Sequence, residues 1–151
     1  MRRMETPWWI FYIAEDACFD DNKVGKWMYF FYGVEGADFV DNVCKEVVEK
    51  EFVKEAKYTN PLSFGLNPNA SRADSGVACF YLNIDDMEGH RKIINYFIEH
   101  NMIQKTKAGK FYNIPFKLDK QTTAGEYGEA FVFKLNLDKF IDLSTGEWID
   151  D

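Results

Sequence analysis

The chain has 151 residues and a formal net charge of −7, and 17% of its residues are aromatic. The length favours a single domain spanning residues 1–151, and the acidic balance argues against binding to extended nucleic acid, which needs a basic surface. No apolar run approaches the roughly 20 residues that span a bilayer. Three dispersed cysteines favour a reducing cytoplasm, and we expect no membrane partner.

The first half of the chain predicts aromatic strands and one helix. An uninterrupted apolar run at Trp8–Ala14 predicts a strand buried on both faces or nearly so. A second aromatic strand is expected at Lys26–Tyr32, followed by a turn at 33–36. Residues 37–52 predict a helix, because their apolar positions recur every three or four residues. A further strand is expected at Val53–Thr59.

The second half alternates polar loops with strands. Residues 60–75 are rich in Asn, Pro, Ser and Gly and predict a loop. A central strand is expected at Gly76–Ile84, followed by a helix that one of two adjacent aspartates caps. A glycine-containing turn within 102–114 predicts a hairpin. The apolar alternation at 131–137 predicts a late strand with one face in water.

The order of these elements predicts an α+β fold. Strands outnumber helices, and the two main helices interrupt them singly. The simplest packing is a curved, mostly antiparallel sheet with both helices on one face. The opposite face is then either solvated or forms a concave binding site, the default place for a ligand in a small aromatic-rich domain.

Several short segments occur in a recognisable order. They are Gly25-Lys26-Trp27-Met28, the helix at 37–52, Ala56-Lys57, the strand at 77–82, the helix at 86–100, and Phe116-Lys117-Leu118-Asp119 with Thr122. Together they resemble the translation initiation factor 4E superfamily, and look closest to its basophilic-leukaemia-expressed family. The resemblance implies a curved antiparallel sheet backed by helices. Cap-binding members hold a methylated guanine between two tryptophans, but the segment that carries them is largely missing here. Lys57 is the position that lines up with a phosphate-gripping residue.

The candidate ligand-binding residues are loop cations and N-terminal tryptophans: Lys57, Arg72, Lys117, Lys120, Trp8 and Trp9. If the loops converge, the cations could hold a phosphate, whereas the alternative is that they are solvated loop residues. Adjacent residues of a strand face opposite ways. One of the two tryptophans is therefore the better candidate for a stacking platform, and the alternative is that the N-terminal strand is covered on both sides. Trp27 is expected in the core.

These residues predict a non-enzymatic binding protein for a nucleotide or another phosphorylated small molecule. Such a protein could serve a phage or mobile element by sequestering a host signalling nucleotide. The alternative is an acidic inhibitor or adaptor that docks on a basic partner protein. A third reading is an enzyme that uses Glu126 as a general base. No metal or cofactor is expected, because neither histidine lies near suitably spaced ligands and no glycine-rich phosphate loop is present.

Overall fold

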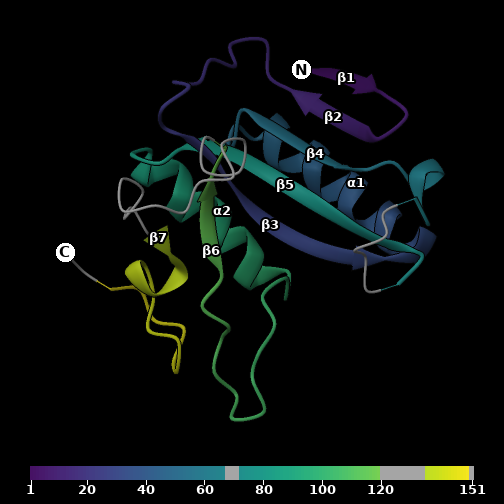
Figure 1. Ribbon diagram of the computed structural model, residues 1–151. Helices are drawn as coiled ribbons and strands as arrows, with labels where there is room; N and C mark the ends of the chain where they lie inside the picture. Colours follow the sequence, from purple (N-terminus) through teal and green to yellow (C-terminus); the bar gives the residue numbers. More distant parts are fainter. Residues whose placement is uncertain (67–71, 120–134, 150–151) are drawn as a thin grey trace. The chain divides into compact units, whose positions relative to one another are not determined.

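The computed structural model of residues 1–151 describes residues 1–66, 72–119 and 135–149. These residues form an α+β fold in which two helices pack on an open antiparallel sheet of seven strands (Figure 1). The order along the sheet is β1-β2-β4-β5-β3-β6-β7. The strands are β1 (Arg2–Glu5), β2 (Trp9–Ile13), β3 (Val24–Tyr32), β4 (Glu55–Thr59), β5 (Ser75–Asn83), β6 (Pro115–Leu118) and β7 (Leu135–Asn136). The helices are α1 (Gly33–Glu49) and α2 (Met87–Glu99). The predicted fold class is confirmed.

The chain groups into two compact units. Unit 1 comprises Met1–Cys18 and Met28–Leu82, and unit 2 comprises Phe19–Trp27 and Asn83–Asp151. Strand β3 contributes its first residues to unit 2 and its remaining residues to unit 1, because the division falls after Trp27. No helix among the described residues is long and apolar enough to cross a membrane.

Helix α1 backs the strands of unit 1 in Figure 1. Its buried residues recur at helical spacing and form the face that packs on the sheet: Ala37, Val40, Val43, Cys44, Val47 and Val48. The helix begins at Gly33, so the turn expected at 33–36 is wrong. Gly33 has a φ of 69°, which suits glycine, and its N–H donates to the Asp74 carbonyl at 3.0 Å. The chain therefore passes from β3 into α1 without a loop.

Unit 2 contains α2, β6 and β7. Asp86 caps α2, since its carboxylate accepts from the Gly89 N–H at 3.0 Å. After the helix, Asn101 has a φ of 54°, a conformation that asparagine tolerates at helix ends. Of the predicted hairpin at 102–114, only the turn is confirmed: an isolated bridge between Lys105 and Phe111 closes it, and no strand forms on either side within these residues. Strand β6 was not predicted, and it pairs with the start of β3.

The N-terminal strands differ from the prediction in two ways. Strand β2 is buried on one face only, because Ile10 and Tyr12 are buried while its other residues stay partly exposed. The side chains on one face of β2 therefore pack in the core, whereas those on the other face are partly exposed to solvent. Strand β1 was not predicted, and all of its residues are exposed. It pairs with β2 and forms one edge of the sheet.

Trp27 lies in the core of unit 2, as predicted, and is fully buried. Its indole N–H donates to Nδ1 of His90 at 3.0 Å, and the rings of Phe116 and Phe140 meet it edge-on. Asp86 and His90 are four residues apart on a helix, a spacing typical of a surface pair, but His90 is also fully buried. Its Nε2 lies 2.9 Å from the Ile84 carbonyl. Because the indole can only donate, Nδ1 carries no proton and Nε2–H donates to Ile84.

This arrangement predicts a loss of stability in acid. Burial lowers the pKa of His90, and the hydrogen bond to the Ile84 carbonyl opposes that shift only in part. An unfolded histidine takes up a proton near pH 6.5, so the unfolded state binds more protons than the native state below that pH. We therefore expect the free energy of unfolding to fall as the pH drops below about 6.5. Urea denaturation at pH values from 5 to 8, roughly the range in which histidine titrates, measures the slope.

The control for this experiment lies at the C-terminal end of the same helix. His100 is exposed, and its Nδ1 lies 2.9 Å from the Tyr96 carbonyl. We expect His100→Gln to keep the acid-dependent slope and His90→Gln to lose it. If His90→Gln does not fold, the imidazole resonances of the wild-type protein provide the test. A native His90 that is protonated at pH 6.5, the ordinary midpoint, would contradict the prediction.

Candidate functional site

The sheet of unit 1 has two faces with different chemistry. Tyr12 of β2 and Tyr58 of β4 both donate to Asp41 of α1 at 2.8 Å, so these positions face the helix. Side chains alternate along a strand. Trp9 and Phe11 of β2 and Lys57 of β4 therefore lie on the opposite side. This side of β1, β2, β4, β5 and residues 28–32 of β3 is called the open face below.

On the open face, an ammonium group lies among aromatic rings. Phe11 is directly opposite Lys57 across β2 and β4. The Lys57 Nζ lies 3.8 Å from the centre of the Trp9 ring and 5.7 Å from the centres of the Phe11 and Tyr81 rings. All three distances are within the range in which a cation is attracted to the face of a ring. We call Trp9, Phe11, Lys57 and Tyr81 the Lys57 cluster.

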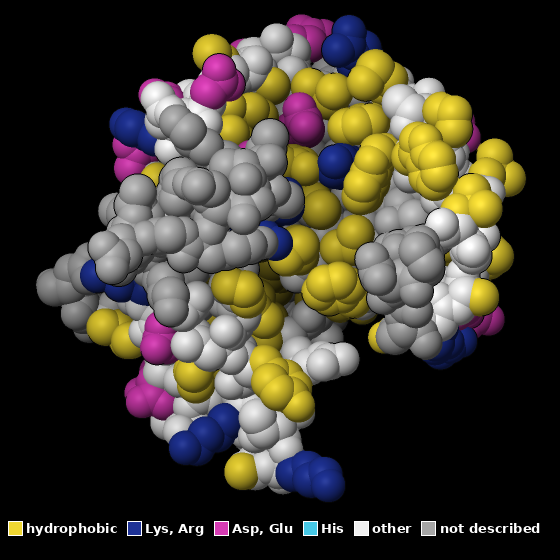
Figure 2. All heavy atoms as spheres, in the orientation of Figure 1, with side chains coloured by type: hydrophobic (Ala, Val, Ile, Leu, Met, Phe, Trp, Pro, Cys, Tyr) yellow, Lys and Arg dark blue, Asp and Glu magenta, His cyan; other side chains and the backbone are white. Residues whose placement is uncertain are grey.

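A row of side chains next to the Lys57 cluster crosses the open face. Trp9 is opposite Thr59, and the Thr59 hydroxyl accepts from the Val77 N–H of β5 at 3.0 Å. On β3, Phe31 faces the helix side, where its ring meets Tyr58, so Phe30 lies on the open face. The Phe31 ring lies over Gly76, which places Phe30 beside Val77. Figure 2 shows hydrophobic side chains gathered over the strands of unit 1 around a basic side chain.

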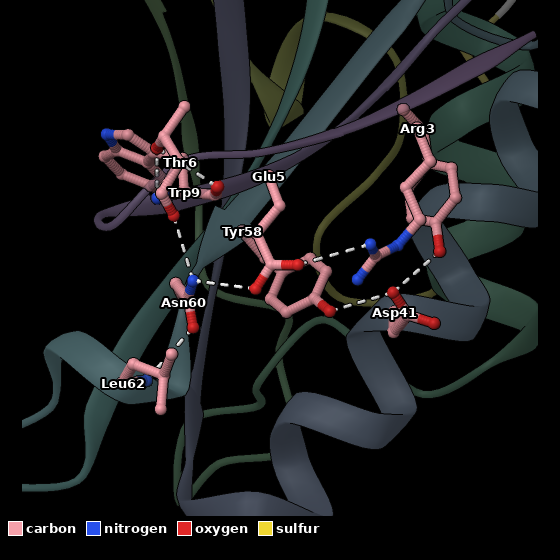
Figure 3. A network of polar contacts seen from close by, with 9 residues as sticks. Arg3, Glu5, Thr6, Trp9, Asp41, Tyr58, Asn60 and Leu62 are labelled. Carbon is pink, nitrogen blue, oxygen red and sulfur yellow. Dashed lines mark hydrogen bonds and ion pairs between the residues drawn. The ribbon is translucent and has the colours of Figure 1, made fainter.

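The Trp9 backbone is held by a separate polar network (Figure 3). The Trp9 N–H donates to the Thr6 hydroxyl at 2.9 Å, and the Thr6 N–H donates to the Trp9 carbonyl at 2.8 Å. The Asn60 side chain is buried and donates to the Thr6 carbonyl at 2.9 Å and to Glu5 at 3.3 Å. Its own oxygen accepts from the Leu62 N–H. The end of β4 therefore fixes the start of β2, and with it the position of the indole.

The helix side of the same strands carries a carboxylate shared by two phenols. Asp41 accepts from Tyr12 and Tyr58 on the same oxygen. Burial raises the pKa of Tyr58, and the bond to Asp41 raises it further. Burial likewise raises the pKa of Tyr12. Both phenols therefore remain protonated donors at neutral pH. Arg3 forms an ion pair with Glu5 at 3.5 Å within β1, and Glu5 accepts from Asn60 at 3.3 Å, which ties the edge strand to the network that holds Trp9.

The structure places the predicted site residues in three different settings. Trp9 and Lys57 lie together on the open face, and Lys57 is inside β4 rather than after it. Trp8 precedes β2 and is 55% exposed. Arg72 lies over the Tyr32 ring, with its guanidinium carbon 4.7 Å from the ring centre, and pairs with Asp74 at 2.9 Å.

The remaining cations belong to unit 2 or to residues outside the description. Lys117 was expected in a loop, but it lies on β6, opposite Lys26 of β3. Lys26 forms an ion pair with Asp119 at 3.0 Å. Lys120 and Glu126 lie outside the described residues. The candidate site therefore rests on Trp9 and Lys57 alone among the residues that the sequence singled out.

Sequence reasoning missed Phe11, Tyr81 and Phe30. Phe11 follows Trp9 by two residues, so strand alternation would have placed both on one face. Tyr81 and Phe30 could not be placed from local sequence, because they come close to Trp9 and Lys57 only through the strand order β2-β4-β5-β3. The buried Asn60 carried no signal, since it belongs to a stretch expected to be a polar loop.

Among residues 1–66, 72–119 and 135–149, no group of three or more His, Cys, Asp or Glu side chains is placed to hold a metal ion. The cysteines in this part of the chain are free thiols, and Cys44 and Cys79 are buried. Comparison with known proteins found no matching family model, curated protein or solved structure. The resemblance to the initiation factor 4E superfamily therefore stays a prediction from the sequence.

Proposed function

We propose that this protein binds a nucleotide, or another flat phosphorylated small molecule, on the open face of unit 1 and leaves it chemically unchanged. The observation that supports this most directly is the Lys57 ammonium held 3.8 Å from the Trp9 ring. A nucleotide needs a flat apolar surface for its base and a cation for its phosphate. Stacking of one base on an aromatic side chain contributes about 1–3 kcal/mol, and the Lys57 cluster offers both partners within one small area.

The two partners have separate roles in this proposal. The base stacks on the Trp9 indole, whose backbone is fixed by Thr6 and Asn60. The ammonium of Lys57 reaches the phosphate from the neighbouring strand and acts as a point charge. Because the surrounding rings partly shield the ammonium from water, its attraction to an anion is stronger than that of a fully solvated lysine.

The alternative of an acidic docking protein gains no support from the acidic run at 46–55. Its carboxylates are interleaved with lysines that pair with them. Glu46 pairs with Lys50 at 3.2 Å, and Glu51 pairs with Lys54 at 3.8 Å. Such interleaving lowers the net field that would steer a basic partner. A protein that binds a signalling nucleotide without turnover would act by sequestration, the role that we propose for this chain.

Calorimetry with adenosine monophosphate and adenosine tests the proposal. We expect Trp9→Ala to weaken binding of both compounds by about 1–3 kcal/mol, roughly 5- to 150-fold in Kd. Lys57→Ala is expected to weaken the monophosphate by roughly 10-fold or more, because a hydrogen bond to a charged group contributes about 1.5–3 kcal/mol. It should change adenosine binding little, since adenosine carries no phosphate.

Lys45→Ala is the matched control, because Lys45 is an exposed lysine of α1 and lies away from the open face. Lys57→Arg should restore part of the affinity by keeping the charge. The proposal fails if no nucleoside monophosphate with any of the common bases binds at millimolar concentration. It also fails if Lys57→Ala and Lys45→Ala behave alike. Chromatography of the recovered nucleotide checks that it stays intact over hours.

A further inference from the structure

Phe30 is the least expected side chain on the open face. It lies within a nine-residue strand, yet it is 64% exposed. Its neighbour Phe31 is buried against the helix side. Beside Phe30, β5 presents Val77, and the described part of β6 pairs with β3 only at Gly25 and Lys26. Hydrophobic side chains gather over the strands of unit 1 in Figure 2, and a contiguous exposed apolar patch of this kind marks a surface that contacts something else.

Phe30 and Trp9 stand at opposite ends of one row. The row runs from Trp9 on β2 through Thr59 on β4 and Val77 on β5 to Phe30 on β3. Neighbouring strands lie about 4.8 Å apart, so the two aromatic residues are separated by three spacings, about 14 Å. The side chains between them are short and β-branched. The row therefore has a large aromatic side chain at each end and two short side chains between them.

We infer that the open face takes a dinucleotide, with one base on Trp9 and the second base on Phe30. This inference rests on the proposed function, because it assigns the same site a larger ligand. A single base cannot touch both rings across about 14 Å. Two bases that spread in opposite directions from one phosphodiester can do so, with the phosphodiester over Thr59 and Val77.

The position of the positive charge agrees with this arrangement. Lys57 is on β4, between the strands that carry Trp9 and Phe30. It lies two residues from Thr59 and so faces the same side of the sheet. Its flexible stem lets the ammonium leave the Trp9 ring and reach a phosphodiester at the centre of the row. The acidic net charge of −7 favours such a short ligand over a longer strand, whose many phosphates need many cations.

The test compares adenosine monophosphate with the linear dinucleotide adenylyl-adenosine monophosphate by calorimetry. We expect the dinucleotide to bind the wild-type protein about 10-fold more tightly or better, since it gains a second stacked base. Phe30→Ala should remove this advantage and leave the affinity for the monophosphate unchanged. Tyr112→Ala is the matched control, because it removes an exposed aromatic ring from unit 2 and should change neither affinity.

The outcomes separate this inference from the proposed function. If neither compound binds, both are wrong. If the monophosphate binds but the dinucleotide binds no better, or if Phe30→Ala weakens both compounds equally, the dinucleotide inference is overturned while the proposed function stands. Sedimentation of the wild-type protein and of Phe30→Ala completes the test. A wild-type dimer that Phe30→Ala dissociates, with dinucleotide affinity unchanged, would show that Phe30 contacts a second copy and would also overturn the inference.

Discussion

Replacing Asp41 with alanine should lower the free energy of unfolding by about 3 kcal/mol. The Asp41 carboxylate accepts from Tyr12 and Tyr58 on one oxygen, and both phenols belong to the buried core. Without the carboxylate, two buried donors lose their acceptor at once. Each unsatisfied group costs about 1–3 kcal/mol, so two cost about 2–6 kcal/mol, and partial relaxation toward water keeps the loss in the lower half of that range. Chemical denaturation measures the loss.

Three other variants identify the cause of that loss. Asp38→Ala removes an exposed carboxylate from the same helix and should change stability by no more than about 0.5 kcal/mol. Tyr12→Phe and Tyr58→Phe each remove a donor together with its need for an acceptor, so each should cost about 0.5–1.5 kcal/mol. A loss for Asp41→Ala no larger than that for Asp38→Ala would show that the shared carboxylate does not stabilise the fold.

The polar networks of unit 1 also explain how the fold supports the proposed site. Asp41 fixes the helix-facing side chains of β2 and β4, and these are the strands whose other faces carry Trp9 and Lys57. Asn60 fixes the turn that precedes Trp9. The indole is thus positioned by rigid strands rather than by a loop, which lowers the entropy lost when a ligand stacks on it.

Much of the fold could be predicted from local patterns. The apolar spacing of α1 and the cap at Asp86 are properties of neighbouring residues, and both were confirmed. The prediction that Trp8–Ala14 is buried on both faces or nearly so held for one face only. The sequence could not separate the two faces, because apolar and aromatic residues occupy both core and surface positions of this strand. Ile10 packs in the core, whereas Trp9 and Phe11 serve the open face.

The candidate site was predictable only in part, because it depends on strand order. Trp9 and Lys57 are 48 residues apart, since 57 − 9 = 48, and nothing local indicates that β2 pairs with β4. Their contact follows from the register in which Phe11 is opposite Lys57. The exposure of Phe30 follows from its place on β3, where only β5 pairs with this end of the strand in the described residues. Long-range pairing of this kind is not encoded in periodicity.

Gly25→Ala should be among the most destabilising single-methyl additions in unit 2. A Cβ at this position would lie 2.5 Å from Cε2 of the Phe116 ring and 2.7 Å from the Lys117 backbone oxygen. The ring cannot move freely, because it packs against Trp27 and His90 with centroid distances of 5.4 and 4.8 Å. The carbonyl belongs to β6, which pairs with Gly25 itself. We expect a loss of about 2–3 kcal/mol from overpacking.

Gly109→Ala separates the effect of crowding from that of the backbone. Gly109 has no atom within 4 Å of the added Cβ, but its φ of 84° disfavours alanine, so this change should cost only about 1–2 kcal/mol. Thermal unfolding should show the larger decrease for Gly25→Ala, by roughly 2–4 °C for each additional kcal/mol. Equal decreases would mean that β6 moves away from the added methyl group with no loss of stability. The expected difference would instead show that glycine precedes Lys26 and Trp27 because β6 and the Phe116 ring approach the backbone too closely for any side chain.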